Sequence, residues 1–371
     1  MKFNCLQENL KQCLNFLQKA IPNKPNLPIL SSILMEAKDN EVVFSATDLY
    51  LGIKGKILAE VEKPGSIVIP GDVFKQMIYS FNPGKISFEQ KKSAINVKSN
   101  QSKVKLPFQD ASEYPDFPKI KGEKYELSKE VLEKIEKLVS FSTSTDQTRP
   151  ILTSILLKLS NNGLEVVATD GFRLSVLLED SLKFKRERTF LVPVKAISEV
   201  FRMMNQSQSE KTILEVSEEL KQIKFIINGY ELFVRLIEGD FPPYEKIIPD
   251  SYNYQVVLSA DLLLAEIKRA YILAKDVSNI IKLKINNEKI CVNSSSPSFG
   301  NYQGTIELLK KNKSDFEEEI AFNARYLLDF LNNTKAETVW IGINESLKPA
   351  MFKPEELEGY KHIIMPFRVN N

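Results

Sequence analysis

The sequence has little of the residue types on which many enzymes and metal sites depend. It contains one histidine, His362, three cysteines and 14 glycines among 371 residues. The cysteines, Cys5, Cys13 and Cys291, are odd in number and lack CxxC spacing, which argues against a disulfide framework and a zinc site. No GxGxxG or GxxxxGKS/T pattern occurs, so nothing supports nucleotide binding by a glycine-rich loop. We therefore expect no metal, no cofactor and a reducing compartment.

Long apolar runs and an excess of one charge are also missing. No run of about 18 apolar residues occurs, and the amphipathic start MKFNCLQENLKQCLNFL lacks the unbroken apolar core of a signal peptide. The 50 Lys and Arg residues nearly balance the 48 Asp and Glu residues, leaving a net charge of +2. The sequence has no basic tail of the kind that would indicate a nucleic-acid partner. We expect a soluble, cytoplasmic protein whose contacts with DNA would be local and weak.

What the sequence does contain is an internal repeat. The segment PILTSILLKLSNNGLEVVATDGFR matches PILSSILMEAKDNEVVFSATDLYL at an offset of 122, so that Ala-Thr-Asp at 46–48 recurs at 168–170. A fainter third copy, residues 279–296, fits at an offset of 247. This period is far longer than the roughly 20 to 50 residues of solenoid repeats. We predict three similar domains: residues 1–121, 122–247 and 248–371.

Each third is predicted to hold two helices and several short strands. Apolar residues at helical spacing predict first helices at 7–20, 128–141 and 259–274, and second helices at 71–81, 194–204 and 322–331. In the helix at 71–81 we expect four residues to face inward: Val73, Met77, Ile78 and Phe81. Alternating runs such as 41–48 and 222–228 predict antiparallel strands. The pattern predicts an α+β fold, with two helices packed on antiparallel sheets in each domain.

The carboxylates and the histidine allow an alternative interpretation. Asp48 and Asp170 could act as acid and base, but each ends an equivalent strand in a different domain, where Asp commonly closes a turn onto its own backbone. We interpret His362 as a satisfied or surface-exposed residue and not as a catalytic base. The alternative function is a cytosolic enzyme with a site at the junction of the second and third domains, around Asp170, Arg173 and Asp240.

Seven segments, in order, carry a resemblance to a known family: LPIL, ATDLYL, STDQTRPIL, ATDGFRL, RLIEGDFPPYEKIIP, FNARYLLDFL and IIMPFRV. In this order and spacing the chain closely resembles, from end to end, the bacterial DNA polymerase III beta subunit, the replicative sliding clamp. The resemblance implies the clamp fold and a head-to-tail homodimer that closes as a ring around duplex DNA. It also implies a processivity factor without catalysis of its own. A few spaced lysines would suffice, because phosphate contacts add up without reading the sequence.

The resemblance also implies partners and site residues. The first implied partners are duplex DNA, bound without regard to its sequence, and a second copy of the chain. The others are the polymerase III catalytic subunit, the clamp loader and repair factors, which carry clamp-binding peptides. Implied DNA contacts are Lys24 and Lys195. The implied dimer interface includes Lys103, Val104, Leu106, Ile272 and Leu273. The implied peptide groove consists of Leu152, Thr169, Gly171, Phe172, Arg173, Leu174, Pro242, Lys246, Ile247, Asn323, Tyr326, Leu347, Ile363, Ile364, Met365, Pro366, Phe367, Arg368 and Val369.

Overall fold

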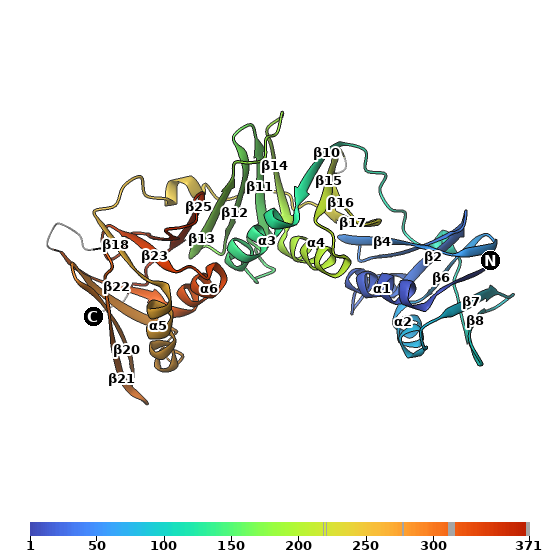
Figure 1. Cartoon of the computed structure of the whole chain (residues 1–371), viewed down its shortest axis with the longest axis horizontal. Coiled ribbons are helices and arrows are strands. Elements are labelled where there is room, and N and C mark those ends of the chain that lie inside the picture. Colours follow the sequence, from blue (N-terminus) through green and yellow to red (C-terminus); the bar gives the residue numbers. More distant parts are fainter. Residues whose placement is uncertain (218, 220, 277, 311–315, 369–371) are drawn as a thin grey trace. The chain divides into compact units, whose positions relative to one another are not determined.

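Each third of the chain repeats one order of elements in a computed structural model that describes residues 1–217, 219, 221–276, 278–310 and 316–368. The order is one strand, one helix, four strands, a second helix and three strands, with one additional strand in the first third (Figure 1). The predicted two helices per third are therefore confirmed. Within the described residues, no helix is both long and apolar enough to cross a membrane.

The elements have the following bounds. The first third contains β1 (Lys2–Leu6), α1 (Gln7–Leu17), β2 (Ser32–Lys38), β3 (Glu41–Thr47), β4 (Leu51–Leu58), β5 (Glu60–Lys63), β6 (Gly65–Pro70), α2 (Gly71–Ser80), β7 (Lys85–Gln90), β8 (Ile95–Ser99) and β9 (Ser102–Leu106). The second contains β10 (Glu123–Ser128), α3 (Lys129–Leu138), β11 (Ser154–Ser160), β12 (Gly163–Thr169), β13 (Arg173–Glu179), β14 (Arg188–Pro193), α4 (Val194–Ser207), β15 (Lys211–Ser217), β16 (Gln222–Ile227) and β17 (Tyr230–Arg235). The third contains β18 (Tyr254–Ser259), α5 (Ala260–Ala274), β19 (Ile280–Asn286), β20 (Lys289–Ser296), β21 (Gly300–Glu307), β22 (Glu317–Asn323), α6 (Ala324–Thr334), β23 (Thr338–Ile343), β24 (Ala350–Pro354) and β25 (Tyr360–Ile364).

The chain packs as two compact units. Unit 1 combines Met1–Leu132 with Lys195–Leu236, and unit 2 combines Glu133–Val194 with Ile237–Asn371. The middle third is therefore shared between the units, because its strands join sheets of both. The division into residues 1–121, 122–247 and 248–371 stays a prediction.

Every ladder in the four sheets is antiparallel, as the alternating runs predicted. Unit 1 contains a five-stranded sheet, β5-β1-β7-β8-β9, and an eight-stranded sheet, β10-β15-β16-β17-β4-β3-β2-β6. Unit 2 contains an eight-stranded sheet, β14-β11-β12-β13-β25-β24-β23-β18, and a four-stranded sheet, β21-β20-β19-β22. Each eight-stranded sheet takes four strands from one third and four from the next, and the joining pairs are β4 with β17 and β13 with β25.

The hairpins fix the alignment of the third copy. Ile285 of β19 lies opposite Ile290 of β20, as Ala37 of β2 lies opposite Val42 of β3. Both pairs match at an offset of 248, so the expected offset of 247 is wrong by one residue. The error arose because the third copy has few identities to fix its alignment.

The first helices of the first and second thirds bury their apolar stripes as predicted, but the second helix of the first third differs. In α2 the buried apolar side chains are Phe74 and Ile78, whereas Val73 is 51% exposed and Met77 is only half-buried. The inward orientation expected of Val73 is therefore wrong. Residues 73 and 77 form one stripe and residues 74 and 78 the next, and the stripe with the large aromatic ring faces the core.

Candidate functional site

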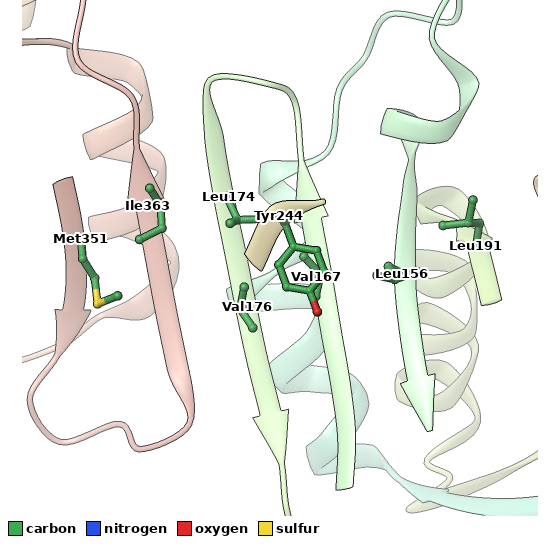
Figure 2. Close-up of a cluster of buried hydrophobic side chains, with 8 residues drawn as sticks. All are labelled: Leu156, Val167, Leu174, Val176, Leu191, Tyr244, Met351 and Ile363. Carbon is green, nitrogen blue, oxygen red and sulfur yellow. The ribbon is translucent and has the colours of Figure 1, made fainter. Parts of the chain in front are cut away.

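An apolar cluster lies on the eight-stranded sheet of unit 2 (Figure 2). Eight buried residues from six strands and one short helix form it: Leu156, Val167, Leu174, Val176, Leu191, Tyr244, Met351 and Ile363. Half-buried apolar residues pack against this cluster and bring it toward the surface: Ile151, Ile237, Phe241, Ile247, Ile248, Tyr252 and Trp340. A cluster that grades from buried to half-exposed apolar residues is suited to receive apolar side chains of a ligand.

The connector between the second and third copies is fixed to this cluster by Tyr244, in a 3-10 helix (Tyr244–Ile247). Its ring lies over β12 and β13 (Figure 2). Lys158 Nζ donates to the Tyr244 hydroxyl at 2.6 Å and to Glu245 Oε1 at 2.7 Å, while the hydroxyl donates to Glu165. Burial, followed by the hydrogen bond to Glu165, raises the pKa of Tyr244. The neutral phenol therefore holds the connector against β11 and β12.

The turn between β12 and β13 is built by its own side chains. Asp170 Oδ1 accepts from the backbone N–H groups of Phe172 at 2.9 Å and Arg173 at 3.0 Å. Asp48 accepts in the same way from residues 50 and 51, at 2.9 and 2.6 Å. The prediction that both aspartates close turns is confirmed. Gly171 has φ of +95°, a conformation that glycine adopts without strain.

Arg173 is the first residue of β13, and both acidic and aromatic side chains contact its guanidinium. Its Nε donates to Asp170 Oδ2 at 2.9 Å and its Nη1 to Asp329 Oδ2 at 2.6 Å. The guanidinium also lies over the rings of Tyr326, at 4.7 Å from the centroid, and Phe141, at 5.5 Å. Because its side chain is only 10% exposed, Arg173 organises this region and presents no free cation at its surface.

The C-terminal segment follows β25 and runs along the same turn. The Met365 N–H donates to the Phe172 carbonyl at 2.8 Å, and the Phe367 N–H donates to the Ala321 carbonyl at 2.7 Å. Two large apolar side chains are thereby displayed, Phe172 at 57% and Phe367 at 49% exposure, and Leu347 in the loop before β24 is 56% exposed. Exposed apolar side chains beside an apolar cluster mark an interaction surface.

The other predicted groove residues also belong to unit 2. Ile363 and Ile364 are fully buried and Thr169 is 4% exposed. The half-buried residues are Leu152, Pro242, Ile247, Tyr326, Met365, Pro366 and Asn323, and the side chain of Asn323 caps α6; Lys246 and Arg368 are exposed. Val369, Asn370 and Asn371 lie outside the described residues. The structure therefore brings together Thr169 to Leu174, Ile247, Tyr326 and the C-terminal segment.

Several residues of the apolar cluster, and the acidic partner of Arg173, were not predicted from the sequence. Tyr244, Val167, Met351 and Trp340 line the cluster, and Asp329 holds Arg173. The sequences of β12 (GLEVVAT) and β24 (AMFKP) do not alternate between apolar and polar residues, because both faces of these strands are largely buried, so periodicity gave no sign of which residues face the cluster. It could not have shown that two strands from different thirds meet.

His362 lies fully buried on β25. Its Nδ1 is 2.9 Å from the Ser175 hydroxyl, its ring stacks on Phe330 at 5.1 Å, and its Nε2 has no hydrogen-bond partner within the described part of the chain. The interpretation as a satisfied or surface-exposed histidine is wrong, because one nitrogen is unsatisfied and neither is exposed. Among the described residues, no group of three or more His, Cys, Asp or Glu side chains could hold a metal ion.

The residues implied for DNA binding and dimerisation are mostly accessible. Lys24, in the loop before β2, and Lys195, the second residue of α4, are both exposed in unit 1. On the edge strand β9, Lys103 is exposed, Val104 half-buried and Leu106 buried. On α5 of unit 2, Ile272 is 68% exposed and Leu273 is half-buried.

Comparison with known proteins covers almost the whole chain. Residues 1–118, 126–243 and 245–368 match the N-terminal, central and C-terminal domains of the DNA polymerase III beta subunit. Proteins named beta sliding clamp from Staphylococcus epidermidis and Synechococcus elongatus are 29% and 27% identical, with 99% and 100% of both chains covered.

Solved structures show the same fold. The polymerase III beta subunit of Thermotoga maritima has a TM-score of 0.90 at 26% identity, and the sliding clamp of Bacillus subtilis has a TM-score of 0.94 at 24% identity. Both comparisons cover 100% of each chain. The alternative interpretation as an enzyme is not supported. The chain therefore belongs to the DNA polymerase III beta subunit family, the non-catalytic sliding clamps of DNA polymerase.

Proposed function

We propose that this sliding clamp works in the cytoplasm as a head-to-tail homodimeric ring on duplex DNA. Its partners, the polymerase III catalytic subunit, the clamp loader and repair factors, bind through short peptides to a groove in unit 2. The observation that carries the proposal is the apolar cluster of unit 2, with half-buried apolar residues packed against it and with Phe172 and Phe367 exposed in the turn before β13 and in the C-terminal segment. No cofactor takes part.

The groove suits a short peptide with apolar side chains. The half-buried apolar residues packed against the cluster, such as Ile247 and Trp340, offer aliphatic and aromatic surface onto which Leu and Phe side chains of a peptide can pack. Gly171 has no side chain, so a peptide backbone can come close to the turn. Met365 is flexible and polarisable, and can adapt to different partners. The half-buried groove residues would become fully buried in the complex.

The sheets themselves argue for the dimer. Four strands of one third and four of the next form each eight-stranded sheet, but two half-sheets have no such complement. One is β1-β7-β8-β9 in unit 1, which β5 extends beyond β1 and which has β9 at its other edge. The other is β21-β20-β19-β22 in unit 2, with β21 at its edge. Pairing of β9 with β21 of a second copy would complete a third sheet of the same plan. Such a head-to-tail contact uses two different surfaces and closes when its rotation does.

The same symmetry gives the register of that contact. When the hairpins of the three copies are aligned, Leu51 is equivalent to Gly300 and Val234 is equivalent to Leu106. In the β4–β17 ladder Leu51 lies opposite Val234. Leu106 should then lie opposite Gly300 of the partner subunit, and Val104 opposite Tyr302 of the partner subunit. Ile272 and Leu273 on α5 would be covered in the dimer.

A disulfide tests this register. Val104→Cys with Tyr302→Cys, in a Cys291→Ser background, should give covalent dimers on oxidation, because directly opposed Cα atoms lie within disulfide range. The matched control, Lys103→Cys with Tyr302→Cys, shifts one residue to the other face of the strand and should give far fewer. Equal yields from both pairs would contradict the register.

Lys24 and Lys195 are the proposed DNA contacts. Both are exposed in unit 1, one in a loop and one in the first turn of α4. Isolated lysines can contact phosphates without fixing a sequence, which permits sliding. The ring keeps the protein on DNA, so a net charge of +2 is sufficient.

The function as a whole is tested by retention on DNA. Loaded onto a nicked circle, the protein should stay bound through gel filtration in moderate salt, and it should be lost when the circle is cut to a linear molecule. A monomer, or equal retention on circular and linear DNA, would contradict the ring.

A further inference from the structure

The eight-stranded sheet of unit 1 has the same plan as the sheet that carries the groove in unit 2. In both sheets an Ala-Thr-Asp turn leads into the joining strand, β4 in unit 1 and β13 in unit 2. In both sheets the same backbone bond follows: the Arg235 N–H donates to the Tyr50 carbonyl at 2.9 Å, as the Met365 N–H donates to the Phe172 carbonyl at 2.8 Å. Unit 1 therefore contains a structural counterpart of the groove.

The two ladders can be compared residue by residue. Gly52 lies opposite Phe233, as Leu174 lies opposite Ile363. Lys224 lies opposite Phe233 on the other side, as Met351 lies opposite Ile363. The apolar positions Leu174, Val176, Met351 and Ile363 of unit 2 thus become Gly52, Lys54, Lys224 and Phe233 in unit 1. Three of the four positions change from an aliphatic or thioether side chain to a glycine or a lysine.

The space over this counterpart is filled by Phe117. A Cβ added to Gly52 would lie 2.7 Å from Phe117 Cε1, so the ring occupies the position that a side chain at residue 52 would need. The ring also packs edge-on against Phe233, with centroids 5.3 Å apart. Phe117 lies between β9 and β10, near the end of the first third, and is half-buried. It covers the face of the sheet that corresponds to the cluster of unit 2.

Two lysines make the remaining surface unsuitable for an apolar ligand. Lys54 Nζ lies over the Phe117 ring, 4.5 Å from its centroid. Lys224 is 11% exposed and pairs with Glu215 and Glu231, each at 3.1 Å. An apolar peptide placed here would pack against cationic side chains instead of an apolar floor, and it would remove the remaining water from Lys54 and from the carboxylate partners of Lys224.

We infer that Phe117, Lys54 and Lys224 determine where partner peptides bind, by filling and charging the counterpart site of unit 1 so that only the groove of unit 2 accepts them. This inference rests on the proposed function of that groove. Two sheets with the same strand arrangement would then differ in peptide binding because of a few side chains.

The test restores the missing site in a chain whose own groove is disabled. The parent is the full chain without residues 365–371, which should not bind a labelled peptide of the Gln-Leu-x-Leu-Phe type. Into it are placed Lys54→Val, Phe117→Ala, Glu215→Gln and Lys224→Met, which open the space and remove both lysines together with the buried carboxylate that pairs with Lys224. The matched control carries Phe117→Ala and Lys224→Arg and keeps the cation.

Fluorescence anisotropy of the peptide reads out the result. We expect binding to the opened variant, at least tenfold weaker than to the intact chain, and none to the parent or the arginine control. If the folded opened variant gains no site, or if the parent binds peptide in a way that Phe117→Asp abolishes, the inference is wrong. If the parent binds as tightly as the intact chain and Phe117→Asp has no effect, the groove of unit 2 itself is wrongly assigned. Should the alanine variant fail to fold, Phe117→Val in the same background carries the same test.

Discussion

Arg173 donates from Nη1 to Asp329 Oδ2 at 2.6 Å, and this ion pair joins the turn before β13 to α6. The same guanidinium pairs with Asp170 and lies over the Tyr326 ring. Arg173 and Asp329 come from different thirds of the chain, 156 positions apart. The turn that presents Phe172 is therefore fixed to the helix of the next third, beside the proposed groove.

Loss of Arg173 should affect stability and peptide binding more than loss of Asp329. Arg173→Met keeps an apolar stem and the backbone N–H groups that donate to Asp170, but it removes the ion pair to this carboxylate, and we expect unit 2 to lose about 2 kcal/mol. Asp329 is 44% exposed, so solvent screens its pair and Asp329→Asn should lose about 0.5 kcal/mol. Urea unfolding and peptide titration of both variants check this. Equal, small effects would contradict an organising role for Arg173.

Removal of residues 365–371 should abolish peptide binding and leave the fold intact. The described part of this segment is attached by the N–H groups of Met365 and Phe367, whereas Ile363 and Ile364 keep their buried places on β25. Two lost hydrogen bonds predict a loss of about 1–2 kcal/mol. Circular dichroism and sedimentation measure the fold, and peptide titration measures the function. If these residues were core only, truncation would unfold unit 2.

Charges on the exposed face of α5 should separate the dimer. Ile272→Asp with Leu273→Asp places two carboxylates where we propose that a second copy packs, and sedimentation should show monomers. Leu262→Asp is the control, because Leu262 is 55% exposed near the start of the same helix. A double variant that remains dimeric would show that the interface lies elsewhere.

Local patterns predicted the fold well where one side of an element is clearly apolar. The stripe of α1, with Leu10, Cys13, Leu14 and Leu17, is buried as expected. In α2, by contrast, two neighbouring stripes are both apolar, and periodicity alone cannot choose between Val73 and Phe74. The third copy was displaced by one residue because few identities marked its hairpin.

The candidate site was predicted only as far as the family resemblance reached. It placed Phe172 beside the C-terminal segment, and the structure joins Phe172 to Met365. Neither the resemblance nor local periodicity revealed that Lys158 donates to the Tyr244 hydroxyl, because the two residues are 86 positions apart and periodicity contains no information about such contacts. His362 was misjudged for the same reason, since its burial depends on strands and helices from two thirds.

The DNA contacts should be additive and indifferent to sequence. Lys24→Ala and Lys195→Ala should each weaken loading modestly, and each lost phosphate contact should reduce the slope of log affinity against log salt by about one. Lys38→Ala is a control, because this exposed lysine lies at the end of β2. Loading is measured on two duplexes of different sequence over a salt series. An effect on one duplex only would contradict phosphate contact.

His362 should make the folded protein sensitive to mild acid. Burial, and then the charge of Arg173, lowers the pKa of His362 well below its ordinary value of 6.5. The unfolded chain takes up this proton near pH 6.5 and the folded chain does not. The unfolded state therefore binds more protons below that pH, and stability falls as the pH falls.

The variant His362→Leu isolates this effect, because the chain has no other histidine. It removes the proton, while the Ser175 hydroxyl keeps Ser142 at 2.8 Å as a partner. Between pH 7.5 and 5.5 the wild type should lose about 1.4 kcal/mol more unfolding free energy than the variant, measured by urea unfolding at several pH values. Carboxylates titrate alike in both proteins, so they cancel in the difference. Parallel curves for the two proteins would mean that the folded state accepts the proton, and that the strands around His362 open to water.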